Sequence, residues 1–508
     1  MQLPDTVTAG MATAHGRTLA QTIGLVLGPA IAAALLIADA EGWKLDPSRD
    51  RLNAMAAVAA LMAVWWLTEA VPLAVTALLP LVLFPLLKIP PYSDVAFQYG
   101  REILFLFLGG FLIALGIEES GLHRRVALHV LALVGDRPRQ IVLGFMLATA
   151  VLSMWISNTA TTLMMLPIAV SVLAQVDRNE ANRAMARPFG IALLLSVAYS
   201  ASIGGIATLI GTPPNLMFLD FYQRYAPGET VSFAGWMALA MPFSVVMLLF
   251  AWLLLTRVLF PVGAERLLGG KSVVREQLRG LGPISSAEFR MAIIFAVTAL
   301  LWVTREPLEG WGWGPAFGTL NEETGMRISL AKDSTVAIFM AVLCFIVPRG
   351  GGDRQTLVTW DLTPRIPWAI ILLYGGGFAL GTGLMETGLD VYLGNRLAEQ
   401  MGGLSPTARV GLVTTAMTFF TELTSNMASV TMILPILGET ARQLEMPVWD
   451  LMVPATLAAS CAFMLPIATA PNAIVYSTGR IRMWDMIRAG FLLNILGVVL
   501  VVLWMQVV

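Results

Sequence analysis

The sequence has little charge and few of the side chains on which metal and redox enzymes depend. Only 13% of its 508 residues are charged and 57% are hydrophobic, whereas a soluble globular protein carries about 25% charged residues. The formal net charge of −1 gives no indication of a nucleic-acid partner. The two cysteines, Cys344 and Cys461, both lie in apolar runs, which is typical of packed thiols rather than of a disulfide or a metal pair.

Motifs for enzymatic chemistry are also missing. The three histidines have no metal-ligand spacing, and the zinc-peptidase pattern H-E-x-x-H does not occur. The stretch GGKS at 269–272 is similar to a phosphate-binding loop, but Glu265 stands where the first glycine is required. We therefore expect neither an intramembrane enzyme nor a bound organic cofactor.

Long apolar runs are what the sequence has in abundance. The runs 237–256 and 489–508 reach the roughly 20 residues that span a bilayer. Alternating segments of about 10 residues, typical of a transmembrane barrel, are not visible. The sequence therefore predicts an all-α polytopic membrane protein with about eleven transmembrane helices. These spans lie near residues 19–39, 53–68, 72–87, 103–119, 188–222, 233–262, 289–304, 331–348, 367–386, 450–478 and 485–507.

Two further stretches, 138–175 and 407–440, carry a Ser-Asn cluster between apolar flanks. Positive charge in the short loops orients the spans, with the N-terminus in the cytoplasm and the C-terminus outside. The two interrupted stretches are then re-entrant hairpins, the first entering from the cytoplasm and the second from outside. We expect a multi-pass protein of the plasma membrane, in a bacterial inner membrane, in contact with lipid. The loop residues that set this orientation are Arg124, Arg125, Arg137, Arg139, Arg178, Arg183, Arg187, Arg266, Lys271, Arg275, Arg279, Arg349, Arg354, Arg365, Arg480, Arg482 and Arg488.

Three blocks of sequence occur twice in the same order, about 260 residues apart. SNTATTLMMLPI at 157–168 matches SNMASVTMILPI at 425–436 at seven of twelve positions. GGFLIALGIEESGL resembles the later GGFALGTGLMETGL, and GTPPN resembles the later ATAPN. An odd number of predicted crossings separates the copies, so the repeat is inverted. Inverted repeats with broken helices near the midplane are typical of secondary transporters.

The presence of polar motifs within apolar segments needs an explanation, because an unsatisfied polar group in hydrocarbon costs several kcal/mol. The prolines of GTPPN and ATAPN should interrupt their helices and leave free N–H groups at one edge and free carbonyl groups at the other. The N–H edge suits a carboxylate or sulfate and the carbonyl edge suits Na⁺. One hairpin tip with one broken helix thus predicts one cation site, and the repeat predicts two. Since the motifs lack Arg and Lys, a bound anion would be balanced by cations that bind first.

The paired tips, the IGTPPN stretch and the run ASCAFMLPIATAPNAIV at 459–475 resemble the divalent anion/sodium symporter family, with its sodium/dicarboxylate, citrate and sulfate transporters. The resemblance covers roughly residues 50–508. It implies a homodimer of elevator-type carriers, in which a mobile transport domain moves against a scaffold domain. The corresponding parts are a cytoplasmic tail 1–18, scaffold 19–135, transport 136–262, a cytoplasmic linker 263–288, scaffold 289–404 and transport 405–508.

The resemblance also implies which residues bind ions and substrate. The first sodium site would comprise Ser153, Ser157, Asn158 and the backbone at Gly211. The second would comprise Thr421, Thr424, Ser425, Asn426 and the backbone at Ala468. The carboxylates of the substrate would meet Asn158, Thr159, Thr212, Pro213, Asn426, Met427, Thr469 and Pro471. Met427 departs from the dicarboxylate type, which has threonine there; it offers no hydroxyl and narrows the pocket.

Simpler roles compete with these assignments. Ser157, Asn158, Ser425 and Asn426 could cap their helices. Ser153 and Thr421 could bond back to a helix carbonyl, and Thr424 could act through its backbone.

Two acids, Glu69 and Glu422, lie in apolar surroundings. We favour a structural role for both, as buried carboxylates that fix a bend by accepting from backbone N–H groups, over proton coupling.

The sequence therefore favours sodium-coupled symport of a small di- or tricarboxylate such as succinate, malate or fumarate, with at least two Na⁺ ions as coupling ions. The alternatives are a sodium-independent dicarboxylate or citrate exchanger and a sodium/sulfate symporter on the same fold. A channel is disfavoured because midplane sites on paired hairpins imply alternating access.

Overall fold

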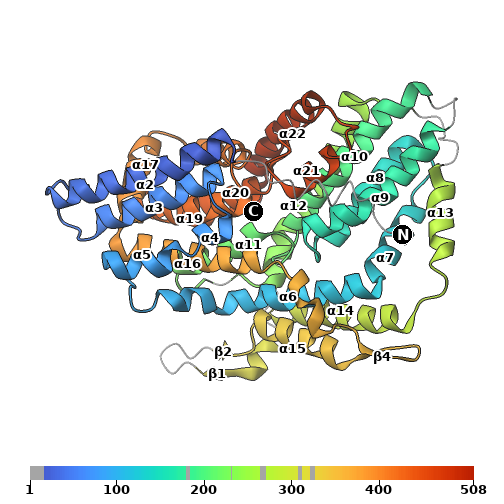
Figure 1. The fold of residues 1–508 in the computed structure, drawn as a ribbon, viewed down its shortest axis with the longest axis horizontal. Coiled ribbons are helices and arrows are strands. Elements are labelled where there is room, and N and C mark those ends of the chain that lie inside the picture. Colours follow the sequence, from blue (N-terminus) through green and yellow to red (C-terminus); the bar gives the residue numbers. More distant parts are fainter. Residues whose placement is uncertain (1–16, 179–182, 230, 264–269, 307–311, 321–326) are drawn as a thin grey trace.

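The computed structural model describes residues 17–178, 183–229, 231–263, 270–306, 312–320 and 327–508. These residues form helices almost throughout (Figure 1), with two small antiparallel ribbons. One pairs β1 (Gly318–Leu320) with β2 (Arg327–Ser329), and the other pairs β3 (Pro348–Gly350) with β4 (Asp353–Thr356). Most of the predicted tail 1–18 and the basic residue Arg266 lie outside the described residues.

Eight of the described helices are long and apolar enough to cross a membrane, which confirms the predicted all-α polytopic class. Four apolar helical stretches of the described residues are shorter, one of them made of two consecutive short helices, so the number of crossings stays a prediction. The long helices are α2 (Leu19–Ala40), η1 with α6 (Val95–Gly100 and Glu102–Ser120), α9 (Asn158–Asp177), α10 (Arg183–Ile206), α12 with the π-helical η3 (Phe233–Leu253 and Leu254–Leu259), α14 (Ser286–Arg305), α16 (Trp368–Thr387) and α22 (Met483–Trp504). The shorter ones are α3 (Leu52–Thr68), α4 (Leu73–Thr76), α5 (Leu79–Leu87), α8 (Pro138–Ser153) and α15 (Asp333–Ile346).

Both predicted hairpins are helix–turn–helix units. In the first, α8 ends at Ser153 and α9 starts at Asn158, and the two helices pack against each other. In the second, α18 (Pro406–Phe420) is followed by α19 (Asn426–Gln443), and α18 packs against α22 and against α20 (Trp449–Ala459). In both units a serine that directly precedes the asparagine caps the second helix.

The proline motifs interrupt their helices as predicted. Helix α10 ends at Ile206, and α11 (Pro213–Tyr225) begins at the first proline of GTPPN. Helix α20 ends at Ala459, and α21 (Ala470–Tyr476) begins beside Pro471. Proline is favoured in the first turn of a helix because its fixed φ suits the helix and its missing N–H is not needed there. The stretches 207–212 and 460–469 are consequently non-helical segments within the fold, which we call break 1 and break 2.

Three helices were not predicted as separate elements. Helices α7 (Leu122–Leu133) and α17 (Leu389–Met401) follow Gly121 and Gly388, whose φ values of 81° and 73° turn the chain after α6 and α16. Helix α13 (Gly270–Gly280) packs against α7 and α9. Helix α7 packs on α8 and α17 packs on α19, so each copy of the repeat includes one such short helix.

The two copies of the repeat interlock. Helix α9 of the first hairpin contacts α21 of the second copy, and α19 of the second hairpin contacts α11 of the first copy. Helix α16 packs along α19, and a Cβ on its Gly377 would approach Met217 and Thr431 to within 3 Å. Gly377 therefore allows a close approach of α16 to α11 and α19.

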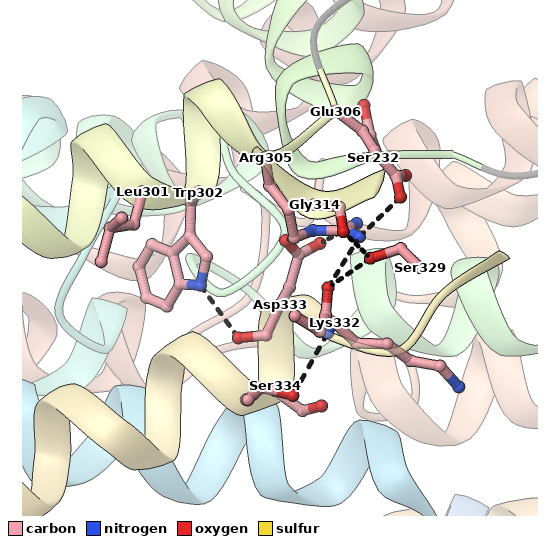
Figure 2. A network of polar contacts seen from close by, with 12 residues as sticks. Ser232, Leu301, Trp302, Arg305, Glu306, Gly314, Ser329, Lys332, Asp333 and Ser334 are labelled. Carbon is pink, nitrogen blue, oxygen red and sulfur yellow. Dashed lines mark hydrogen bonds and ion pairs between the residues drawn. The ribbon is translucent and has the colours of Figure 1, made fainter. Parts of the chain in front are cut away.

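Helices α14 and α15 meet the start of α12 at a buried polar network (Figure 2). Arg305 Nε donates to Asp333 Oδ1 at 2.6 Å, and the indole N–H of Trp302 donates to the Asp333 carbonyl at 3.0 Å. The backbone N–H of Phe233, at the start of α12, also donates to the Asp333 carboxylate. This network ties α12 to α14 and α15.

An aromatic cluster lies beside this network. Trp155, in the turn of the first hairpin, stacks on Trp302 with 6.4 Å between ring centroids and meets Phe295 edge-on at 5.0 Å. Phe233 stacks on Trp302 at 4.8 Å. The first hairpin tip is therefore packed directly against α14.

Candidate cation and substrate site

The first hairpin tip gathers oxygen atoms around one hydroxyl group. Ser153 is fully buried, and its Oγ lies 2.6 Å from Asn158 Oδ1 and 2.7 Å from the Ala201 carbonyl oxygen. A hydroxyl carries one hydrogen, so it can donate to only one of these two acceptors at a time. A surplus of oxygen lone pairs is the environment that a small hard cation requires.

Break 1 adds a carbonyl to this tip. A Cβ on Gly205 would lie 2.6 Å from Asn158 Oδ1 and 3.0 Å from the Gly211 carbonyl oxygen. The absence of a side chain at Gly205 therefore lets α10 approach both oxygens closely. The structure thus brings together Ser153, Asn158 and Gly211, three of the four predicted ligands of the first site. The fourth, Ser157, caps α9 by accepting from the Ala160 N–H at 3.3 Å, so its capping role is confirmed.

The second tip repeats the arrangement with different residues. Thr421 is fully buried, and its Oγ1 lies 2.8 Å from Asn426 Oδ1 and 3.0 Å from the Ala459 carbonyl oxygen. Ser425 caps α19 by accepting from the Ala428 N–H at 3.2 Å. Ser153 and Thr421 therefore reach across to a neighbouring helix, and the alternative that they only bond back to their own helix is wrong.

Two more predicted ligands lie beside the second tip. Thr424 Oγ1 is buried without a hydrogen-bond partner among the described residues, so it has lone pairs free for a ligand. Ala468 lies near the end of break 2, at the position that Gly211 has at the end of break 1. The next-to-last residue of each break can thus contribute a backbone carbonyl oxygen.

Two further asparagines, one at the end of each proline motif, hold the breaks in shape. Asn215 Nδ2 donates to the carbonyls of Gly205, Ile206 and Thr208 at 2.7–3.2 Å. Asn472 Nδ2 donates to the carbonyls of Ala462 and Leu465 at 3.2 and 3.1 Å. Their occurrence at the end of both GTPPN and ATAPN was the signal for this shared role. The Oδ1 atoms of both asparagines are buried and without a partner in the described part of the chain.

The structure places the two acids Glu422 and Glu69 in different surroundings. Glu422 accepts from the backbone N–H groups of Phe463 and Met464 at 2.6 and 2.8 Å and of Leu465 at 3.1 Å. Its predicted structural role is therefore confirmed. For Glu69 the prediction of a buried carboxylate is wrong: it is exposed at the end of α3 with a φ of +48°. The left-handed backbone at this residue ends α3.

The residues predicted to meet the substrate lie at four helix starts. Asn158 and Asn426 begin α9 and α19, while Thr212 and Thr469 precede α11 and α21 in extended conformation. Thr469 Oγ1 accepts from the Asn472 N–H at 3.3 Å, which caps α21. Free N–H groups at helix starts, with the positive end of the helix dipole, favour an anion.

The remaining predicted substrate contacts differ in accessibility and in chemistry. Thr159 is exposed whereas its counterpart Met427 is only 5% exposed. Pro213 and Pro471 lie in the first turns of their helices and have no N–H to donate. The starts of α9 and α19 consequently have more backbone donors than those of α11 and α21.

Comparison with known proteins gives a consistent result. Residues 46–507 match the model of a family described as the sodium:sulfate symporter transmembrane region. A sodium-dependent dicarboxylate transporter, SdcS, from Staphylococcus saprophyticus is 38% identical over 490 residues, which cover 95% of this chain and 90% of that protein. Its counterpart from Staphylococcus aureus is 38% identical over 491 residues, with the same coverage.

Two solved structures share the fold at low sequence identity. The YdaH transporter of Alcanivorax borkumensis has a TM-score of 0.54 at 14% identity, over 82% of this chain and 88% of that one. MtrF of Neisseria gonorrhoeae has a TM-score of 0.58 at 13% identity, over 98% of this chain and 96% of that one. These similarities establish an architecture shared with transporters.

Proposed function

Because the chain belongs to the sodium:sulfate symporter family, we propose that it is a sodium-coupled symporter of a small dicarboxylate such as succinate, malate or fumarate. The observation that carries the proposal is the pair of oxygen clusters at Ser153–Asn158 and Thr421–Asn426, related by the inverted repeat. The names of the two staphylococcal relatives support both sodium and dicarboxylate. The protein would act as a homodimer in the bacterial plasma membrane, with the N-terminus cytoplasmic; the homodimer is inferred from family resemblance.

The coupling between Na⁺ binding and substrate binding would follow from the balance of charge in the site. The four motifs contain no Arg or Lys, so a dianion brought to the helix starts needs positive charge from another source. Two Na⁺ ions, held by the first cluster with Gly211 and by the second with Thr424 and Ala468, would supply it. In a low-dielectric site opposite charges attract strongly, so the anion binds well only after the cations. Na⁺ and substrate would then be carried together.

We propose that the carrier works as an elevator. The transport domain would contain the two hairpins, α10–α12 and α20–α22, and the scaffold would contain α2–α6 and α14–α16. Three contacts on the proposed boundary between them would have to break during transport: the α16 glycines against both copies, the Asp333 network and the Trp155 cluster. The glycine-lined face of α16 is a surface along which packed helices can slide.

A cross-link across this boundary should stop transport. Cysteines introduced at Trp155 and Phe295, whose rings lie 5.0 Å apart, would join the first hairpin to α14. In a background without Cys344 and Cys461, a short thiol cross-linker should reduce substrate uptake by proteoliposomes to background, and cleavage of the linker should restore it. As a control, cysteines at Phe345 and Trp360, 6.4 Å apart within the scaffold, should be cross-linked without loss of uptake. Full uptake by protein that is completely linked between 155 and 295 would refute the moving boundary.

Substrate class can be tested by binding. We expect succinate, malate or fumarate to raise the melting temperature of the purified protein in Na⁺ but not in K⁺. Citrate, tartrate and sulfate serve as comparisons, since a sodium/sulfate symporter remains the alternative within the family. Stabilisation by sulfate alone would replace our proposal by that alternative, and stabilisation by none of the anions in Na⁺ would contradict both.

The substitution Met427→Thr adds a hydroxyl donor, so it should increase the rise in melting temperature that four-carbon dicarboxylates cause. If the rise with each anion is the same as in the wild type, Met427 is not part of the substrate site.

A further inference from the structure

The two hairpin tips differ in charge at the position that follows the clustered hydroxyl. Aligned on their Ser-Asn pairs, the tips read Ser153-Met154-Trp155-Ile156 and Thr421-Glu422-Leu423-Thr424. A methionine in the first copy is thus an acid in the second, directly after the residue whose hydroxyl lies in the oxygen cluster. The first tip has no acid at this position, so Glu422 needs a reason that applies to the second copy alone.

That reason lies in how the two breaks satisfy their backbone groups. In break 1, Thr208 Oγ1 accepts from the Gly211 N–H at 3.1 Å and donates to the Met154 carbonyl, so a residue within the break ties it to the tip. Break 2 has Leu465 at the position of Thr208 and cannot do this. It instead presents three successive N–H groups, at Phe463, Met464 and Leu465, to one side chain of the tip.

Glu422 receives all three. It is 3% exposed, and Oε1 also accepts from Asn494 Nδ2 at 2.8 Å. All four partners are donors, so the side chain is held as a carboxylate. Buried N–H groups must be paired, and hydrogen bonds to a charged acceptor are stronger than neutral ones. The carboxylate therefore fixes the start of break 2 against the second tip.

Helix α22 supports this contact from the other side. Asn494 is fully buried, and Gly490 lies one turn before it on the same face of the helix. A Cβ on Gly490 would come within 2.3 Å of the Phe463 backbone. The glycine lets α22 approach break 2 closely enough for Asn494 to reach Glu422. The clamp thus comprises Glu422, Asn494 and the backbone of residues 463–465.

We infer that Glu422 is the positioning residue of the second cation site. It joins the tip that carries Thr421 and Asn426 to the segment that leads, three residues after Leu465, to Ala468. It does not itself ligate the ion, because its oxygens are engaged by four donors. Break 1 is tied to its tip by Thr208 and not by a carboxylate, so the two sites should respond differently to the removal of Glu422. This inference rests on the proposed function, in which Na⁺ binds at both tips.

The test is Glu422→Gln in the full-length protein, measured by hydrogen exchange and by sodium-dependent thermal stabilisation. Glutamine keeps the size but replaces one acceptor oxygen with an NH₂ group that faces N–H donors. Exchange of the amides of 463–465 should accelerate by about tenfold or more, and the Na⁺ concentration for half-maximal stabilisation should rise by about tenfold or more. Asn494→Ala, which removes one of the four donors, should change both quantities in the same direction by a smaller factor.

Two controls separate positioning from general damage. Glu439, on α19, is also a buried carboxylate, paired with Gln443 at 2.7 Å and Arg442 at 3.5 Å; Glu439→Gln should change neither measurement. Ser153→Ala should raise the Na⁺ requirement without accelerating exchange at 463–465. Faster exchange in Glu422→Gln with an unchanged Na⁺ requirement, or unchanged exchange, would overturn the inference. Absence of any stabilisation of the wild type by Na⁺ would instead refute the proposed function. If Glu422→Gln does not fold, Asn494→Ala tests the inference by the same two measurements, amide exchange at 463–465 and the Na⁺ concentration for half-maximal stabilisation.

Discussion

Asn158→Ala and Asn426→Ala should each abolish sodium-driven uptake by proteoliposomes while the protein is still produced and folded. Each asparagine begins the second helix of its hairpin and contributes Oδ1 to an oxygen cluster, 2.6 Å from Ser153 Oγ and 2.8 Å from Thr421 Oγ1. Alanine removes both the cation ligand and the amide donors available to a carboxylate. Loss of one contact to a charged group costs about 1.5–3 kcal/mol, or about 10–100-fold in affinity.

Since Na⁺ and substrate depend on each other, the loss in uptake should exceed the loss in affinity for either alone. The serines that cap the hairpin helices remain in both variants, so the helices should still form. Asn395→Ala, an exposed asparagine on α17, is the matched control and should behave as wild type. Near-normal uptake by both tip variants would refute the assignment of the two sites.

Gly205→Ala should eliminate the first cation site with a single methyl group. The added Cβ would lie 2.6 Å from Asn158 Oδ1 and 3.0 Å from the Gly211 carbonyl oxygen, too close to both proposed ligands of the ion. The methyl group would therefore exclude the cation or force the oxygens apart. We expect uptake to fall to background and the sodium-dependent rise in melting temperature to shrink.

The control for this prediction is on the same helix. Gly190→Ala would place its Cβ 3.7 Å from a Leu173 methyl group, an ordinary contact, and should leave uptake and sodium response unchanged. Both variants replace glycine by a better helix former, so propensity cannot explain a difference between them. Wild-type sodium dependence in Gly205→Ala would show that the cation binds elsewhere.

Much of the site could be predicted from the sequence because strong local signals coincide there. Proline fixes where α11 and α21 can begin, and a Ser-Asn pair before an apolar run marks the start of α9 and α19. The repetition of these signals in one order linked the two halves. The parts played by Ser153 and Thr421 were implied by the resemblance to the symporter family, and the oxygens of these residue types can satisfy both a helix end and a cation.

The features that the sequence did not predict depend on contacts between segments that lie far apart in the chain. Helices α7 and α17 are short and apolar on one face only, so a search for long apolar runs misses them. The backbone carbonyls that Asn215 and Asn472 bind, and the N–H groups that Glu422 binds, are set by how break 1 and break 2 fold back, which local patterns do not specify. Glu69 and Glu422 are both acids in apolar stretches, and only the fold distinguishes the exposed turn from the buried clamp.

The most direct test of sodium-coupled symport is uptake of radiolabelled succinate by proteoliposomes that contain no internal anion. An inward Na⁺ gradient should drive accumulation above equilibrium, and replacement of Na⁺ by K⁺ should abolish it. Uptake that needs an internal dicarboxylate and is indifferent to Na⁺ would contradict the account and identify an exchanger instead.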